Sequence, residues 1–96
     1  MNVIYPEKKI NKDTAKLPAY VKEDAAQQIE ALKKAITLGD MTNVVPMEGT
    51  DEPYYRLKFG NYRMMLYYYA DTETVMLLSI THRKDAYKKQ NLPWRK

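Results

Sequence analysis

The sequence predicts an α+β domain in the order β-α-α-β-β-β, in which two N-terminal helices pack on a small, twisted, mainly antiparallel sheet that is followed by a short C-terminal element. Three observations predict it. Apolar residues recur at steps of three and four from Val21 to Ile36, which is the helical period. Apolar and basic side chains alternate from Tyr55 to Phe59 and break at Gly60-Asn61, which is a hairpin signal. The run from Val75 to Ile80 is apolar almost throughout, as in an interior strand.

Two helices are expected in the N-terminal half, after a short strand around Val3–Tyr5 that ends at Pro6. Residues 7–16 have weak helical spacing and are closed by Pro18. Pro18 then lies in the first turn of the second helix, where its missing N–H is tolerated. The apolar stripe of this helix, which we expect to pack on the sheet, consists of Val21, Ala25, Ile29, Leu32 and Ile36. Gly39 is the expected stop, because glycine commonly follows the last helical turn.

The C-terminal half is expected to form three strands after an acidic connector over residues 40–53. The strands are predicted at about 54–59, 62–70 and 74–81. Asp71-Thr72-Glu73 supplies the turn between the last two. The side chains of the first two strands that should face the helices are Leu57, Phe59, Tyr62, Met64 and Leu66.

A turn at Gly60-Asn61 decides which residues of the first hairpin lie opposite one another. The expected pairs are Phe59 with Tyr62, Lys58 with Arg63, Leu57 with Met64 and Arg56 with Met65. Arg56, Lys58 and Arg63 then share the face away from the helices, and the last two are direct partners. Like charges at that spacing destabilise a hairpin by a few tenths of a kcal/mol to about 1 kcal/mol. A sequence that keeps this destabilising pair of like charges indicates that the face binds an anion.

Size and composition bound the possible functions. Ninety-six residues predict a single domain over residues 1–96, and the longest apolar run is too short to span a bilayer. Without cysteine, and with one histidine, the chain offers neither a disulfide framework nor a thiolate zinc site. We therefore expect a soluble cytoplasmic protein with no metal or other cofactor and no membrane partner.

The net charge of +4 is unevenly distributed. Residues 40–53 carry −4, residues 54–63 carry +3 and residues 82–96 carry +5. Basic charge thus gathers on the hairpin and the C-terminus, which is the pattern of a polyanion-binding face. The alternative for residues 88–96 is a solvated lysine-rich tail.

Several short motifs follow one another along the chain: Leu17-Pro18, Pro46-Met47-Glu48-Gly49, the stretch from Tyr55 to Arg63, and Thr81-His82-Arg83 followed by Tyr87. In this order they resemble the RelE/ParE superfamily of bacterial toxins from type II toxin–antitoxin modules. Each motif alone is weak, but their ordered combination spans about three quarters of the chain.

The resemblance implies a toxin, and two activities occur in the superfamily. Members of the RelE branch are metal-independent ribonucleases that cut messenger RNA, commonly on the ribosome, and a paired antitoxin neutralises them. ParE members keep the fold but poison DNA gyrase. We expect a RelE-like endoribonuclease whose partners are messenger RNA, the ribosome and a cognate antitoxin. The alternatives are a gyrase poison, or a degenerate member that keeps the fold without toxicity.

The same resemblance implies roles for individual residues. Arg63 matches the family arginine that contacts the scissile phosphate, and Arg83 matches a second one. Lys58 and Arg56 match basic positions of the preceding strand, where a lysine helps to activate the 2′-hydroxyl if neighbouring cations depress its pKa. Tyr87 matches a tyrosine that stacks on a base or assists proton transfer; packing of the C-terminal element is the alternative.

The remaining candidates for RNA binding come from their charge and chemistry. They are His82, Lys84, Lys88 and Lys89. The unperturbed pKa of histidine lies near neutrality, so His82 is a natural acid or base. A lone histidine at a strand end also serves structural roles. Tyr67 and Tyr69 share the strand parity of the basic face and either stack on bases or fill a half-buried surface.

Overall fold

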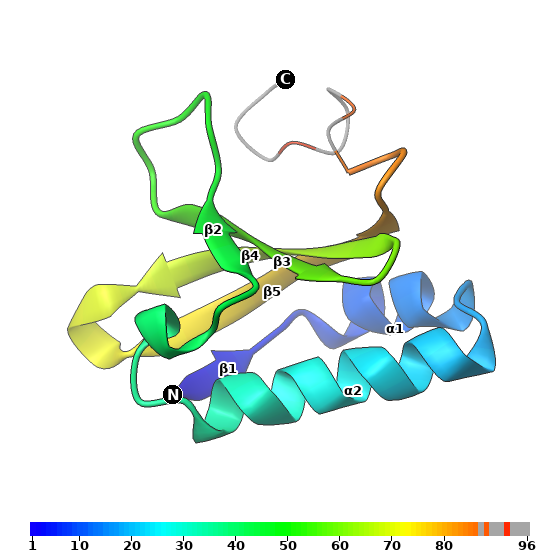
Figure 1. Ribbon diagram of the computed structural model, residues 1–96, viewed down its shortest axis with the longest axis horizontal. Helices are drawn as coiled ribbons and strands as arrows, with labels where there is room; N and C mark the ends of the chain where they lie inside the picture. The colour runs from blue at the N-terminus through cyan, green and yellow to red at the C-terminus, as the bar shows by residue number, and fades with distance from the viewer. Residues whose placement is uncertain (87, 89–91, 93–96) are drawn as a thin grey trace.

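The computed structural model describes residues 1–86, 88 and 92, which form two helices on one face of a five-stranded sheet (Figure 1). The elements are β1 (Asn2–Ile4), α1 (Glu7–Ala15), α2 (Ala19–Lys34), η1 (Leu38–Asp40), β2 (Val44–Pro46), β3 (Tyr54–Phe59), β4 (Tyr62–Tyr69), η2 (Ala70–Thr72) and β5 (Thr74–His82). The strand order is β1-β5-β4-β3-β2, and only the β1–β5 pair is parallel. The predicted α+β class is confirmed. No helix among these residues is long and apolar enough to cross a membrane.

Helix α2 ends earlier than the apolar stripe predicts. Pro18 is its N-cap, immediately before the first turn in which it was expected, and the last helical residue is Lys34, with Ala35 already extended. The carboxylate of Asp40 accepts hydrogen bonds from the backbone N–H groups of Ile36 and Thr37, at 3.0 and 3.1 Å. These bonds turn the chain into η1, so the predicted stripe residue Ile36 is 80% exposed.

The acidic connector contains a strand that the sequence pattern did not predict. β2 pairs antiparallel with β3, and Val45 lies opposite Arg56. Three residues are too short to show an alternating pattern, and Pro46 argues against a strand. Proline is tolerated here because β2 is an edge strand of the sheet.

The β3–β4 hairpin has the predicted register. All four expected pairs are present, including Lys58 opposite Arg63. Gly60 takes a φ of +60°, the left-handed region that the first position of a tight hairpin turn requires. The pattern thus predicted both the turn and the face of each cation.

A β-bulge changes the alternation of β5 relative to β4. Met65 lies opposite Ser79, whereas the next residue, Leu66, lies opposite Leu77. The extra residue in β5 places Leu77 in the core and leaves Ser79 on the face away from the helices.

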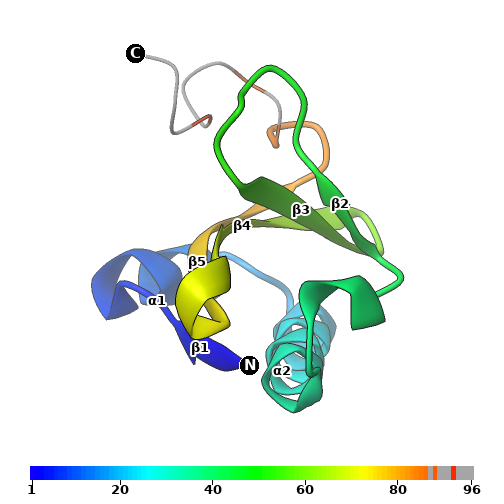
Figure 2. The same ribbon diagram turned by 90° about the vertical axis from the view of Figure 1, so that its left-hand side faces the viewer.

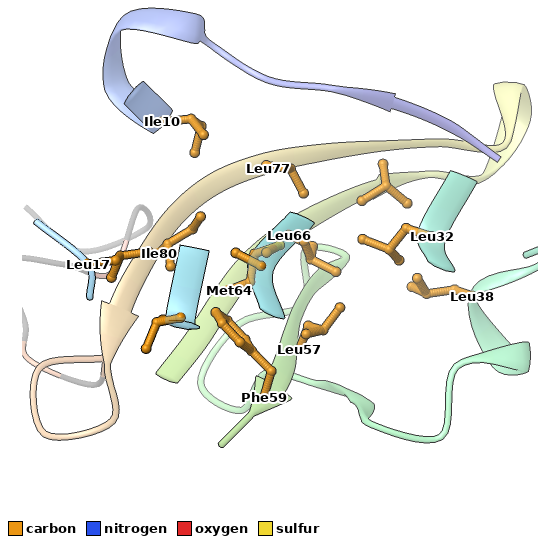
Figure 3. Packing of buried hydrophobic residues seen from close by; sticks show 13 residues of the cluster. Ile10, Leu17, Leu32, Leu38, Leu57, Phe59, Met64, Leu66, Leu77 and Ile80 are labelled. Carbon is orange, nitrogen blue, oxygen red and sulfur yellow. The ribbon is translucent and has the colours of Figure 1, made fainter. Parts of the chain in front are cut away.

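The core lies between the sheet and the two helices (Figure 3). It includes Ile10, Leu17, Val21 and Leu32 from the helical layer and Leu57, Met64, Leu66, Leu77 and Ile80 from the strands. Among the described residues one buried side chain is charged: Asp13 of α1, which is 7% exposed. Its carboxylate accepts a 3.0 Å hydrogen bond from the backbone N–H of Ile80, beyond the point where β1 stops pairing with β5.

Candidate functional site

Four of the predicted cations lie on or beside the face of the sheet away from the helices. Arg56 and Lys58 on β3 and Arg63 on β4 share this face by strand register. Arg83 follows the last residue of β5, and its backbone N–H donates a 2.7 Å hydrogen bond to the carbonyl of Asn61. That bond holds Arg83 beside the hairpin turn. Figure 2 shows residues 83–86, which follow β5, and the β2–β3 loop on the side of the sheet opposite α1 and α2.

The guanidinium groups of Arg56, Arg63 and Arg83 interact electrostatically. Burial lowers the pKa of Arg63 from its ordinary value, and the positive charges of Arg56 and Arg83 lower it further. An arginine remains protonated despite such a shift, because its ordinary pKa lies far above neutrality. The three side chains therefore form a cluster of like charges, which we call the guanidinium cluster. An anion placed among them would relieve their repulsion.

Arg63 is held in place by the hairpin turn. Its Nη1 atom donates hydrogen bonds to the carbonyls of Gly60 and Tyr62, at 3.0 and 2.8 Å. Its Nε is buried and makes no hydrogen bond within the described part of the chain. A buried unpaired donor costs about 1–3 kcal/mol, so stability alone does not account for an arginine here.

The other predicted cations differ in their placement. Lys58 and Lys84 are exposed. Lys88 is exposed and forms a 2.8 Å ion pair with Asp85, whose pKa is lowered chiefly by that hydrogen bond. Tyr87 and Lys89 lie outside the described residues.

His82 lies on the other face of the sheet from Arg63. It pairs with Tyr62, and their rings meet edge to face with centroids 5.2 Å apart. Its Nδ1 accepts a 3.2 Å hydrogen bond from the backbone N–H of Lys84. The ring lines a cavity of about 370 Å³ between α1 and the end of β5, together with Lys9 and Lys16. The geometry favours the structural alternative for His82, because strand parity separates it from the guanidinium cluster.

Sequence reasoning missed the contacts of the acidic connector with this face. Tyr67 donates a 2.9 Å hydrogen bond to the Glu52 carboxylate, and this bond is the main cause of a raised pKa for Tyr67. Met47, Arg56 and Arg63 line one small cavity. The connector's charge of −4 was visible in the sequence. The place of the connector in the fold depends on the pairing of β2 with β3. The sequence did not predict this pairing, because β2 has no alternating residue pattern.

This arrangement suits the binding of a phosphodiester. Arginine presents paired N–H donors that match two phosphate oxygens, and here the charge of Arg63 interacts with those of two further arginines. Within the described residues no group of three or more His, Cys, Asp or Glu side chains could hold a metal ion. The cations that the described residues place on or beside this face are arginine and lysine side chains.

Comparison with known proteins agrees with the fold and the motifs. Residues 4–87 match a family model described as the ParE toxin of the type II toxin-antitoxin system parDE. No curated protein sequence matches the chain significantly.

Solved structures share the fold at low sequence identity. The RelB–RelE antitoxin–toxin complex from Methanococcus jannaschii superposes with a TM-score of 0.71 at 23% identity, over 88% of this chain and 94% of that one. The RelE–RelB complex from Pyrococcus horikoshii OT3 gives 0.68 at 19% identity, over 85% and 93%. The RelBE2 complex from Mycobacterium tuberculosis gives 0.68 at 19% identity, over 88% and 92%.

Proposed function

This chain belongs to the family of ParE toxins of type II toxin–antitoxin systems, within the RelE/ParE superfamily, and we propose that it is an endoribonuclease that cleaves messenger RNA on the ribosome. The observation that carries the proposal is that the charge of Arg63 interacts with those of Arg56 and Arg83 at the hairpin end of the sheet face away from the helices, which we call the open sheet face. Arginines whose charges interact at one end of this face suit the binding of a phosphodiester backbone, which carries the opposite charge.

In the proposed reaction the 2′-oxygen of one nucleotide forms a bond to phosphorus and the bond from phosphorus to the 5′-oxygen breaks. The 2′-hydroxyl gives up its proton and the leaving 5′-oxygen takes one up, so the products end in a 2′,3′-cyclic phosphate and a 5′-hydroxyl. Negative charge grows on the phosphorane oxygens as the new bond forms. Fixed cations aimed at those oxygens stabilise this state more than the ground state.

The residues divide these tasks as follows in the proposal. Arg63 and Arg83 bind the nonbridging phosphate oxygens, and Arg56 adds positive charge beside them. Lys58, opposite Arg63 across the hairpin, activates the 2′-hydroxyl. Tyr87 has the role that the family resemblance implies: it stacks on a base or assists proton transfer to the leaving oxygen.

The test of this proposal is cleavage on translating ribosomes. We expect the purified protein to cut messenger RNA there without added metal and to leave 2′,3′-cyclic phosphate ends. In cells, protein synthesis should stop before DNA breaks appear. Transcripts that stay intact at a high ratio of toxin to ribosome would refute the nuclease assignment.

The second candidate is a gyrase poison, because the matched family model is that of a ParE toxin. Expression should then induce DNA-damage signalling and trap gyrase on DNA while translation continues. The cell assay above separates the two activities, since each predicts a different first event.

A cognate antitoxin is the proposed protein partner. The M. jannaschii and P. horikoshii structures are described as complexes of RelE with RelB. The guanidinium cluster supplies a physical reason for such a partner here, because an acidic, partly disordered segment could fold onto it. Co-expression of the neighbouring gene product should restore growth and give a stable complex with the toxin. Growth arrest that persists in its presence would argue against that product.

A further inference from the structure

We propose that Tyr54, Tyr67 and Tyr69 form a base-stacking subsite for the single-stranded RNA whose phosphate lies at the guanidinium cluster. We call these three side chains the tyrosine platform. The inference rests on the proposed function, because it adds a contact for the same RNA substrate. The tyrosine platform contacts nucleobases within a few positions of the cleaved bond, whereas the guanidinium cluster contacts the phosphate.

The platform is a contiguous aromatic surface built from two strands. Tyr54 of β3 lies directly opposite Tyr67 of β4, and their rings meet edge to face with centroids 4.9 Å apart. Tyr69 is two residues further along β4, with its centroid 4.8 Å from that of Tyr67. Tyr69 is 41% exposed and the other two are half-buried. Aromatic rings at such a surface stack on bases of any sequence, because every base has a π-face.

The platform continues the line of the guanidinium cluster. Tyr54 precedes Arg56 by two residues on β3 and shares its face. Tyr67 and Tyr69 follow Arg63 by four and six residues on β4. At about 3.3 Å per strand residue these separations are about 7, 13 and 20 Å. A single strand of RNA that runs from a phosphate at Arg63 along β4 therefore passes the tyrosines in turn.

The acidic connector explains why bases rather than phosphates would lie on the platform. The Glu52 carboxylate bonds to the Tyr67 hydroxyl, and the backbone N–H of Glu52 bonds to the Thr50 hydroxyl at 3.1 Å. This holds one negative charge at the platform, with Asp51 and Glu48 in the same connector. Carboxylates repel phosphates and accept hydrogen bonds from exocyclic amino groups of bases. The RNA backbone is thereby directed to the arginine end.

Two other tyrosines show what a structural role looks like in this sheet. Tyr55 and Tyr68 lie on the opposite face of the same two strands and pack against the hydrophobic core. Tyr54, Tyr67 and Tyr69 are not part of that core cluster. Their rings contact one another on the face that carries the arginines, so filling the core does not account for them.

The test measures binding of the full chain to a single-stranded RNA that carries 2-aminopurine at each position in turn around its centre. Stacking quenches the fluorescence of this base, and a Tyr69→Ala or Tyr67→Ala variant should bind about 5- to 100-fold more weakly. Tyr67→Phe keeps the ring and should keep most of the affinity. Tyr20→Ala removes a tyrosine that is 69% exposed on α2, on the helical side, and should bind like the unaltered protein.

Salt dependence separates the platform from phosphate binding. The tyrosine variants should keep the slope of affinity against salt, whereas Arg56→Ala should reduce it by about 0.7, the value for one phosphate of a single strand. Thermal melts report folding, and Tyr69→Ala is the decisive variant because its ring is the most exposed of the three.

Three outcomes decide the inference. Weaker binding and lost quenching in Tyr69→Ala support the platform, even if the ribosome assay shows no cleavage and the nuclease proposal fails. Unchanged RNA binding in Tyr69→Ala and Tyr67→Ala overturns the platform, even if cleavage is observed. Variants that bind RNA normally but lose affinity for the antitoxin overturn it in favour of a protein contact.

Discussion

Replacing Arg63 with alanine is expected to lower the single-turnover rate of RNA cleavage by about 10²–10³-fold, while binding to ribosomes changes little. The size follows from the loss of one fixed donor at a site where charge develops in the transition state. Ground-state binding depends less on Arg63, because Arg56 and Arg83 remain in the guanidinium cluster. The measurement compares single-turnover cleavage with ribosome pelleting on the same preparation.

The fold should survive this substitution. The variant loses two hydrogen bonds to the carbonyls of Gly60 and Tyr62, each contributing about 0.5–1.5 kcal/mol. It also loses a buried unpaired Nε and the repulsion from Arg56, Arg83 and Lys58, which offsets part of that cost. We expect a melting temperature within a few degrees of the unaltered protein.

Two further variants complete the Arg63 experiment. Arg63→Lys keeps the charge but not the paired donors, so it should recover only part of the rate. Lys22→Ala removes an exposed cation from α2, on the helical side, and should cleave normally. If the Arg63→Ala protein folds and cleaves RNA at the rate of the unaltered protein, the open sheet face is not the active site.

Replacing Asp13 with alanine is expected to destabilise the fold by about 2–3 kcal/mol, which would lower the melting temperature by about 10–20 °C. Asp13 is buried, and its carboxylate accepts a hydrogen bond from the backbone N–H of Ile80, beyond the end of the β1–β5 pairing. Alanine leaves that N–H buried without a partner and removes a contact between α1 and β5. Thermal and urea denaturation measure the loss.

Two neighbouring variants identify the cause of that loss. Lys9→Ala removes the 2.8 Å ion pair with Asp13, and an i,i+4 pair at a helix surface contributes only about 0.3–0.5 kcal/mol. Asp13→Asn keeps an acceptor oxygen for Ile80 and should lose less than alanine. If Lys9→Ala and Asp13→Ala destabilise equally, the ion pair rather than the bond to Ile80 is the stabilising contact.

Residue pattern alone determined the parts of this protein that depend on near neighbours in the chain. The Gly60-Asn61 turn and the alternation around it predicted the four cross-strand pairs nearest the turn and the face of Arg56, Lys58 and Arg63. The start of α2 after Pro18 was also predicted. These features follow from side-chain period and turn chemistry, which act over a few residues.

Only the tertiary structure decided features that depend on pairing between distant segments. β2 forms because β3 offers it an edge, and α2 ends at Lys34 because Asp40 caps the turn that follows. His82 lies opposite Tyr62, on the other face from Arg63, and Asp13 reaches Ile80 from another element. Local patterns carry no information about such partners. Each of these contacts forms because the folded chain brings a distant backbone group without a hydrogen-bond partner close to it, and only the complete fold decides which groups those are.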